Sequence, residues 1–181
     1  MPNRLAHGEQ ADVVIMARSA LDELVREGRV VNGSQVKLVR SRVAMAVKSG
    51  ARMPDISSVE ALKRAMLEAR SIAYSDSASG VFVEQELILR LGIAGEVASK
   101  ARMIAATSVR SIVARGEAEL GFQQIRELLP IAGIQIVGLI PDAVQKVTVF
   151  SAGITTTARS PAAASKRIDY LVSPGLGRHS K

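Results

Sequence analysis

The sequence predicts an α/β fold in which strands alternate with helices and form a mostly parallel sheet that helices cover on both faces. Three observations lead to this prediction. Short apolar runs of the kind found in buried strands recur along the chain, amphipathic segments follow them, and glycine, serine or proline marks most of the boundaries. In such sheets ligands bind outside the carboxyl ends of the strands, where strand-to-helix turns gather.

The first part of the chain sets this alternation. Residues 2–7 read as the end of a helix stopped by Gly8, and the apolar run 11–16 predicts a buried strand. Residues 19–27 predict a helix, because their leucines fall on one face and Gly28 follows as a C-terminal stop.

Alternating apolar and polar residues over 35–48 predict a long strand, or two strands that meet at Ser41. The Ser-Ser-Val-Glu sequence at 57–60 is a capping box that opens a helix extending through residue 67. An apolar strand follows at 72–74, and an amphipathic helix runs from Val81 until Gly92.

The same strand-turn-helix unit recurs in the second half of the chain. We expect strands at 102–105, 119–123, 134–137 and 144–152, and helices at 109–115, at 124–129 before Pro130, and from the Ser160-Pro161 cap onwards.

Composition limits the functions to be considered. The chain has 181 residues, 48% of them hydrophobic and 23% charged, which suffices for one domain or two small lobes. Its formal charge is +7, but the basic residues are scattered except near the C-terminus, and only 3% of residues are aromatic. Stacking platforms for nucleic acid are therefore scarce, and we expect no nucleic-acid partner. The charge would instead attract small anions.

The chain has few of the residues that a metal site, a nucleotide cofactor site or a catalytic triad requires. The two histidines, His7 and His179, lie near opposite ends of a chain without cysteine, and no glycine-rich nucleotide loop follows a predicted strand. We expect no metal site, no cofactor and no catalytic residues.

No apolar run reaches the length of a membrane span, and the first ten residues lack the apolar core of a signal peptide. We therefore expect a protein that is not embedded in a membrane.

Residues 75–80, Ser-Asp-Ser-Ala-Ser-Gly, form the turn that suits an anion best. Small side chains up to Gly80 let a ligand approach the backbone, Ser77 and Ser79 carry hydroxyl donors, and the first N–H groups of the following helix lack partners of their own. The competing interpretation is a plain serine N-cap, with Asp76 as a local cap rather than a base.

A second polar turn, residues 106–108, precedes the helix that begins at Val109. Because the carboxyl ends of parallel strands share one edge, Ser108 should face the same crevice as the first turn. Arg110 either helps to hold the anion or lies on the surface. Gln124, between a strand and a helix, either donates to the ligand or acts as a capping or solvent-exposed amide.

Four segments, in this order, resemble the molybdate-type solute-binding proteins of ABC transporters. They are Gly-Glu-Gln-Ala-Asp-Val-Val-Ile at 8–15, Ser-Ile-Ala-Tyr-Ser-Asp at 71–76 with Ser79 and Gly80, Gly-Glu-Ala-Glu-Leu-Gly at 116–121, and Val-Thr-Val-Phe-Ser-Ala-Gly at 147–153. The resemblance extends to about residue 174.

This resemblance implies a type II periplasmic-binding-protein fold of two three-layer αβα lobes that bind a small anionic solute with neutral donors. Ligand groups carried over by position are Ser79, the backbone N–H of Val109, and Gln124 where the molybdate binders have tyrosine. It also implies an ABC transporter permease as partner and a periplasmic location, although without a visible signal peptide the cytoplasm is the other location.

The family begins with a strand, a helix and a strand that this chain lacks, so we expect an incomplete first lobe. That lobe would comprise residues 1–42 and 134–181, and the second lobe residues 43–133. Missing strands would leave an apolar edge open, which favours a homo-oligomer or marginal stability.

Three functions follow as hypotheses. The first is a non-catalytic protein that binds a small oxyanion or organic anion. The alternative is an intracellular enzyme on the same scaffold that acts on a small carboxylated substrate and recruits Ser77, Asp76 or Arg110. The third is an effector-sensing domain like that of LysR-type regulators, for which no helix-turn-helix segment precedes the fold.

Overall fold

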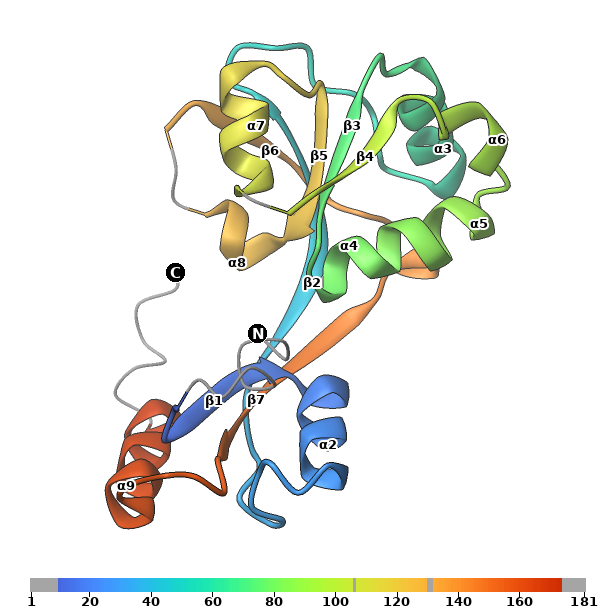
Figure 1. Ribbon diagram of the computed structural model, residues 1–181. Coiled ribbons are helices and arrows are strands. Elements are labelled where there is room, and N and C mark those ends of the chain that lie inside the picture. The colour runs from blue at the N-terminus through green and yellow to red at the C-terminus, as the bar shows by residue number, and fades with distance from the viewer. Residues whose placement is uncertain (1–9, 106, 130–131, 174–181) are drawn as a thin grey trace. The chain divides into compact units, whose positions relative to one another are not determined.

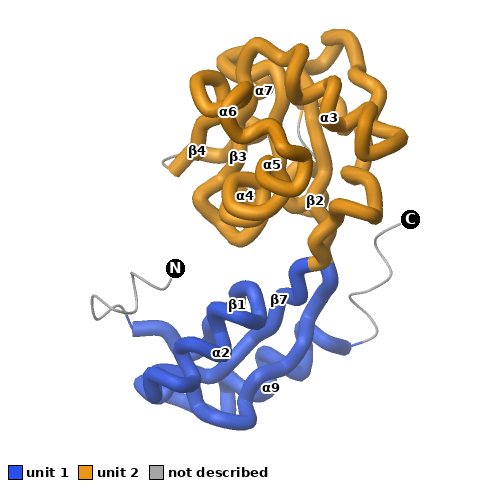
Figure 2. The backbone as a smooth tube through the Cα atoms, turned by 90° about the vertical axis from the view of Figure 1, so that its right-hand side faces the viewer, with its two compact units in different colours: residues 1–40, 148–181 blue, residues 41–147 orange. Residues whose placement is uncertain are grey.

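The computed structural model describes residues 10–105, 107–129 and 132–173 (Figure 1). The chain divides into two compact units, unit 1 with residues 1–40 and 148–181, and unit 2 with residues 41–147 (Figure 2). Strands β2 (Val36–Lys48) and β7 (Val147–Ile154) each contribute residues to both units. The chain therefore passes between the units twice.

The division differs from the predicted lobes at residues 134–147, which belong to unit 2. The reason is strand β6 (Ile134–Leu139), which pairs antiparallel with β2 from Ala44↔Leu139 to Lys48↔Ile134. This pairing ties the segment to the sheet of unit 2.

Unit 1 is built on β1 (Val13–Ala17), which pairs antiparallel with β7. Helix α2 (Arg18–Arg26) buries its leucines against β1, and α9 (Pro161–Val172) starts at a serine cap followed by proline, as predicted. Its core contains Val14, Met16, Leu21, Leu24 and Val30.

Unit 2 has the strand order β2-β5-β3-β4, with β6 also paired to β2. Strand β3 (Ile72–Ser75) lies between β4 (Ala101–Ile104) and β5 (Leu120–Gln124) and is parallel to both, whereas β2 is antiparallel to β5 and β6. The sheet is thus mixed rather than mostly parallel. The carboxyl ends of the parallel strands β3, β4 and β5 still lie at one edge of the sheet, as expected.

Helices cover both faces of this sheet (Figure 1). Ile72 and Tyr74 point into a large core, to which α3 (Val59–Glu68) contributes together with a continuous helical run of α4 (Ala78–Phe82), a π-helical segment η1 (Val83–Leu87) and α5 (Ile88–Arg90). Ala73 points the other way, into a smaller core with Val109 and Val113 of α7 (Val109–Arg115).

Several boundaries differ from the predicted ones. The helix after β3 begins at Ala78 rather than Val81, and the capping residue of α3 is Ser58 rather than Ser57. Residues 36–48 form one strand without a break at Ser41.

Two short helices, α6 (Ala94–Val97) and the 3-10 helix η2 (Asp142–Val144), were not expected. Because η2 occupies 142–144, β7 starts later than predicted. The predicted features at 2–7, Gly8 and Pro130 lie outside the described residues.

None of the helices in the described part of the chain is both long and apolar enough to cross a membrane.

Candidate functional site

The carboxyl ends of β3, β4 and β5 meet at one edge of unit 2. Ser75 is in register with Ile104 of β4, and Asp76 N donates to Ile104 O at 3.3 Å. On the other side Tyr74 is in register with Phe122, so Ser75 and Gln123 follow the last paired residues of β3 and β5. The turns after these strands therefore start side by side.

Three serine hydroxyls form a closed triangle at this edge. Ser75 Oγ lies 2.8 Å from Ser77 Oγ, and Ser79 Oγ lies 3.2 Å from each of them. Ser75 and Ser79 are buried, with 5% and 0% of their surface exposed. We call Ser75, Ser77, Ser79 and Gly80 the serine turn.

The serines that precede helices fall into two kinds. Ser58 and Ser160 accept a hydrogen bond from a backbone N–H of the helix that each begins, α3 and α9. Ser77 and Ser108 occupy the same N-cap position of α4 and α7 but make no such bond. The plain N-cap interpretation of the 75–80 turn is therefore wrong for Ser77 in this structure. The Ser108 hydroxyl does not cap α7 either, so neither hydroxyl accepts an N–H of the helix that follows it.

Gly80 is fixed by the tight packing of the serine turn. A Cβ atom on this residue would lie 1.4 Å from the carbonyl oxygen of Ser75. Only glycine lets the first turn of α4 fold back against the end of β3 and bring Ser79 to Ser75.

Helix α7 lies on the face of the sheet toward which Ser75 and Gln123 point, because side chains alternate along a strand and Ala73 packs against α7. Gly121 of β5 permits this packing, since a Cβ there would lie 2.5 Å from Val113 Cγ2. At the start of α7, Ser108 Oγ lies 2.7 Å from Ser111 Oγ. Ala106 of the preceding turn lies outside the described residues.

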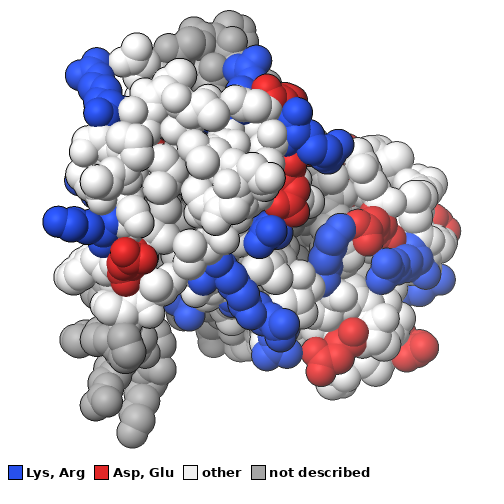
Figure 3. All heavy atoms as spheres, turned by 90° about the horizontal axis from the view of Figure 1, so that it is seen from below, with Lys and Arg blue, Asp and Glu red and all other residues white. Residues whose placement is uncertain are grey.

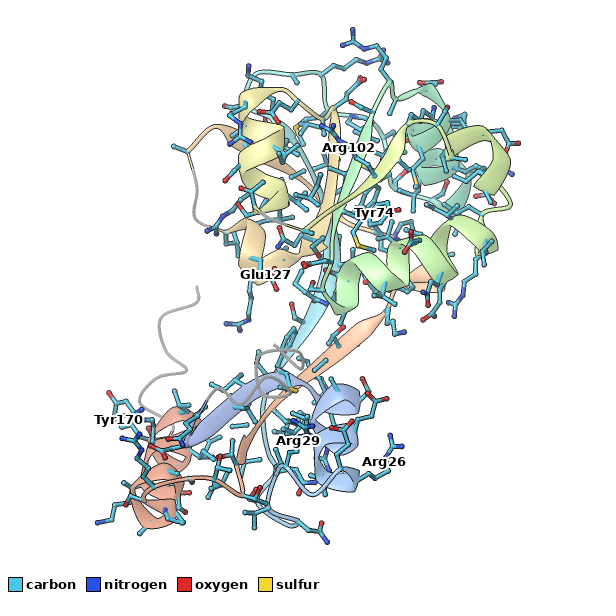
Figure 4. All side chains as sticks on the ribbon, in the orientation of Figure 1. Arg26, Arg29, Tyr74, Arg102, Glu127 and Tyr170 are labelled. Carbon is cyan, nitrogen blue, oxygen red and sulfur yellow. The ribbon has the colours of Figure 1, made fainter. Side chains whose placement is uncertain are left out.

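A second polar group stands next to the end of β5, and we call Arg110, Gln123 and Glu127 the arginine cluster. Arg110 Nη1 donates to the backbone carbonyl of Glu127 at 3.0 Å, and Gln123 Nε2 donates to the Glu127 carboxylate. Figure 4 shows Glu127 on α8 (Ile125–Leu128), the short helix that follows β5. Arg110 Nε and Gln123 Oε1 are buried without a hydrogen-bond partner among the described residues.

Gln124 is buried, with 1% of its surface exposed, and is the N-cap residue of α8. The interpretation of this residue as an exposed amide is therefore wrong. By strand alternation its side chain starts on the opposite face of β5 from Gln123. Of the predicted residues, the structure brings together Ser77, Ser79 and Gly80 in one turn and Ser108, Val109 and Arg110 in the other.

The remaining ionisable features lie apart from this arrangement. Tyr74 donates to Glu84 at 3.1 Å on the other face of β3, and burial, the hydrogen bond and the charge of Glu84 raise the pKa of Tyr74 to about 12. Among the described residues, no three His, Cys, Asp or Glu side chains are grouped to hold a metal ion. Lys and Arg are interspersed with Asp and Glu on the face drawn in Figure 3.

A cavity of about 560 Å³ lies at the opposite, amino ends of β3 and β5, with Val47, Arg52, Arg64, Glu68 and Leu120 in its lining. Its charged side chains are exposed, and Arg70 at its rim already pairs with Glu119 at 3.4 Å. Buried polar atoms without partners lie instead at the arginine cluster, so we place the candidate site there and at the serine turn.

The sequence analysis placed Ser75 in the anion turn but named no ligand contact for it, and it missed Gln123 and Glu127. The alternation of side chains along β5 was a signal for Gln123, because residues two positions apart share a face. Glu127 carries no such signal, since its role depends on the tertiary contact between α7 and α8.

Two comparisons of sequence find similar proteins. A family model described as "Bacterial extracellular solute-binding protein" matches residues 1–176. A protein from Pseudomonas sp named aconitate isomerase is 50% identical over 173 residues, which are 96% of this chain and 66% of that protein. The chain thus spans just under two thirds of the length of this relative.

Solved structures share the fold. The periplasmic molybdate-binding protein of Azotobacter vinelandii superposes with a TM-score of 0.73 at 20% identity over 96% of this chain and 77% of its own. The substrate-binding protein of an ABC transporter from Agrobacterium tumefaciens gives 0.72 at 13% identity over 98% and 65%. At these identities the likeness shows the type II periplasmic-binding-protein fold, as the sequence predicted.

Proposed function

The chain belongs to the family of bacterial extracellular solute-binding proteins, and from this premise we propose that it binds a small carboxylated anion at the serine turn and the start of α7. One observation carries the proposal. Ser77 and Ser108 stand at N-cap positions without capping their helices, while Ser58 and Ser160 elsewhere in the chain do cap theirs.

The donor set suits an anion. Hydroxyl groups, backbone N–H groups at helix starts and one guanidinium all present hydrogen-bond donors, and a carboxylate or oxyanion is an acceptor with several lone pairs. We assign ligand contacts to the hydroxyls of Ser77, Ser79 and Ser108, to the backbone N–H of Val109, and to Arg110. Gly80 shapes the turn, because its own N–H already donates to Ser77 O at 2.9 Å. Gln124 is proposed as a further contact through its amide.

Several observations favour a carboxylate over molybdate. The relative at 50% identity is named for an isomerase of aconitate, a tricarboxylate. The molybdate binder of similar fold is only 20% identical, and Gln124 stands here where the resemblance placed a tyrosine. Neutral donors alone would suit a molybdate ion, whereas Arg110 adds a charge that suits a carboxylate.

Calorimetric titration and thermal melting with trans-aconitate, cis-aconitate, tricarballylate, molybdate and sulfate test the proposal. A ligand at 100 times its dissociation constant should stabilise the folded protein by about 2.7 kcal/mol. A Ser77→Ala, Ser79→Ala double variant should lose this stabilisation, whereas Ser160→Ala should keep it. If none of the carboxylates raises the melting temperature of the wild type, carboxylate binding is excluded.

A second candidate function is isomerisation of an unsaturated polycarboxylate, as the name of the 50% identical relative suggests. In this reaction a base removes a proton from the methylene carbon next to a carboxylate. The electron pair of that C–H bond and the double bond delocalise over three carbons, and the proton returns to the former alkene carbon. No oxidant or second substrate is needed.

Asp76, exposed in the serine turn, is the carboxylate available for this proton transfer. Proton exchange with D₂O, followed by NMR of the aconitate isomers, tests the candidate. Turnover that Asp76→Asn abolishes while ligand binding persists supports an enzyme. Binding without turnover in the wild type supports a solute-binding role, with an ABC transporter permease as the proposed partner and the periplasm as the proposed location.

A further inference from the structure

We propose that the arginine cluster is the subsite that recognises a planar carboxylate of the ligand, with Arg110 as the contacting residue and Glu127 and Gln123 as positioning residues. The inference rests on the proposed function, and it adds the chemical group that the site selects and two residues for which no role has been assigned.

The open edge of the Arg110 guanidinium carries the argument. Nη1 donates to the Glu127 carbonyl at 3.0 Å, which leaves Nε and Nη2 on the other edge. Nε is buried and has no acceptor among the described residues. Two parallel N–H donors on one edge of a guanidinium match the two oxygens of a carboxylate. A tetrahedral oxyanion is also an acceptor, but the two parallel N–H donors of the guanidinium fit a planar carboxylate best.

The charge of Arg110 also lacks an acidic partner within the described part of the chain. Its contact with Glu127 is to the backbone carbonyl, and the side-chain carboxylate of Glu127 is held instead by Gln123 Nε2. A partly buried cation without a counter-ion is costly, and an anionic ligand removes this cost. The Glu127 carboxylate is thus bonded to Gln123 and not to the guanidinium.

The location of Gln123 connects the arginine cluster with the serine turn. Gln123 and Ser75 follow the paired residues Phe122 and Tyr74 of neighbouring parallel strands, so their side chains start from the same face of the sheet. Gln123 has 7% of its surface exposed, and its Oε1 has no donor within the described residues. The open Nε donor of Arg110 requires an acceptor such as a carboxylate oxygen, whereas the open Oε1 acceptor of Gln123 requires a donor, which a water or a ligand hydroxyl supplies. Affinity measurements distinguish a bound ligand from water alone.

The test measures the dissociation constants of trans-aconitate and of molybdate by calorimetry for the full chain and its variants. Arg110→Gln should weaken trans-aconitate binding roughly 30-fold or more, because a buried charged partner is lost. The affinity of Arg110→Lys for trans-aconitate should lie between that of the wild type and that of Arg110→Gln, since lysine keeps the charge but not the paired donors. Gln123→Met keeps Arg110 but frees Glu127 to pair with it, and should also weaken binding.

Arg126→Gln is the matched control, because Arg126 is an exposed arginine of the same helix as Glu127. It should bind trans-aconitate as the wild type does. Circular dichroism and thermal melting verify that each variant folds. If Arg110→Gln does not fold, the more conservative Arg110→Lys is used in its place.

The outcomes separate this inference from the function on which it rests. A wild type that binds no carboxylate overturns both. A wild type that binds trans-aconitate while Arg110→Gln and Arg110→Lys bind it equally well overturns this inference alone. An equal loss of trans-aconitate and molybdate in Arg110→Gln also overturns it, because the guanidinium would then supply charge without selecting the planar group.

Discussion

Ser77 Oγ lies 2.8 Å from Ser75 Oγ, although Ser77 occupies the N-cap position from which a serine usually accepts a helix N–H. The serine hydroxyls at this edge bond to one another rather than to a helix N–H. This arrangement differs from that of Ser58, whose Oγ accepts from Ala61 N at 3.1 Å.

The contrast predicts opposite phenotypes for the same substitution. Ser58→Ala should lower the free energy of unfolding by about 1 kcal/mol, because a helix cap is lost, and should leave ligand affinity unchanged. Ser77→Ala should change stability by less than this and weaken anion binding. Urea denaturation and calorimetry measure the two quantities, and a cap-like loss of stability without a loss of affinity in Ser77→Ala would contradict the assignment.

Gly80→Ala should be among the most damaging single substitutions in unit 2. The added methyl group would lie 1.4 Å from Ser75 O, so the serine turn must open or the protein must fail to fold. We expect a loss of about 3 kcal/mol or more in the free energy of unfolding, at the upper end of overpacking effects.

Gly95→Ala is the control for this substitution. Gly95 lies in α6, and a Cβ there meets nothing within 4 Å. Alanine in a compatible helical position should be neutral or stabilise by up to about 1 kcal/mol. Similar denaturation midpoints for the two variants would show that the tight approach of Gly80 to Ser75 does not hold in solution.

Local signals explain which elements the sequence predicted well. Helix α7 has the predicted bounds 109–115, because Ser108 precedes it and Gly116, with φ at 77°, ends it in the left-handed region. The start of α4 was placed three residues late, since a serine-rich stretch reads as a turn until Gly80 is seen to pack on Ser75. The contact of Arg110 with Glu127 joins two helices across β5, and no local pattern encodes it.

Tyr74 should make stability depend on alkaline pH. Its pKa is raised from 10.0 to about 12 in the folded protein, so the neutral phenol is favoured by folding. Between pH 10 and pH 12 the unfolded chain loses this proton while the folded protein keeps it. The contribution to stability is therefore complete below pH 10 and is lost as the pH rises toward 12.

An absorbance titration of the phenolate should show a transition near pH 12 that disappears in Tyr74→Phe. Urea denaturation across the same pH range should show a steeper loss of stability in the wild type than in the variant. A single transition near pH 10 in the wild type would contradict the raised pKa.

Gln145 should be a stability determinant of unit 2 because its side chain completes the pairing of β2. The amide Oε1 accepts from Val43 N at 2.9 Å, and Nε2 donates to Val43 O at 3.0 Å and to Ile140 O at 3.2 Å. The single side chain thus takes the place of a strand neighbour for Val43, whose side chain is fully buried. Removing it takes the acceptor from Val43 N and the Nε2 donor from Ile140 O in a partly buried place, while Val43 O keeps its bond from Ile140 N at 3.3 Å.

Gln145→Leu keeps the side-chain size but loses these bonds, and we expect it to lower the free energy of unfolding by about 2 kcal/mol, within the usual cost of unsatisfied buried groups. Gln135→Leu, on the exposed side of β6, is the matched control and should change stability by less than about 0.5 kcal/mol. Hydrogen exchange should show faster exchange of the Val43 amide in Gln145→Leu. Unchanged exchange at Val43 would mean that water replaces the amide of Gln145 without cost.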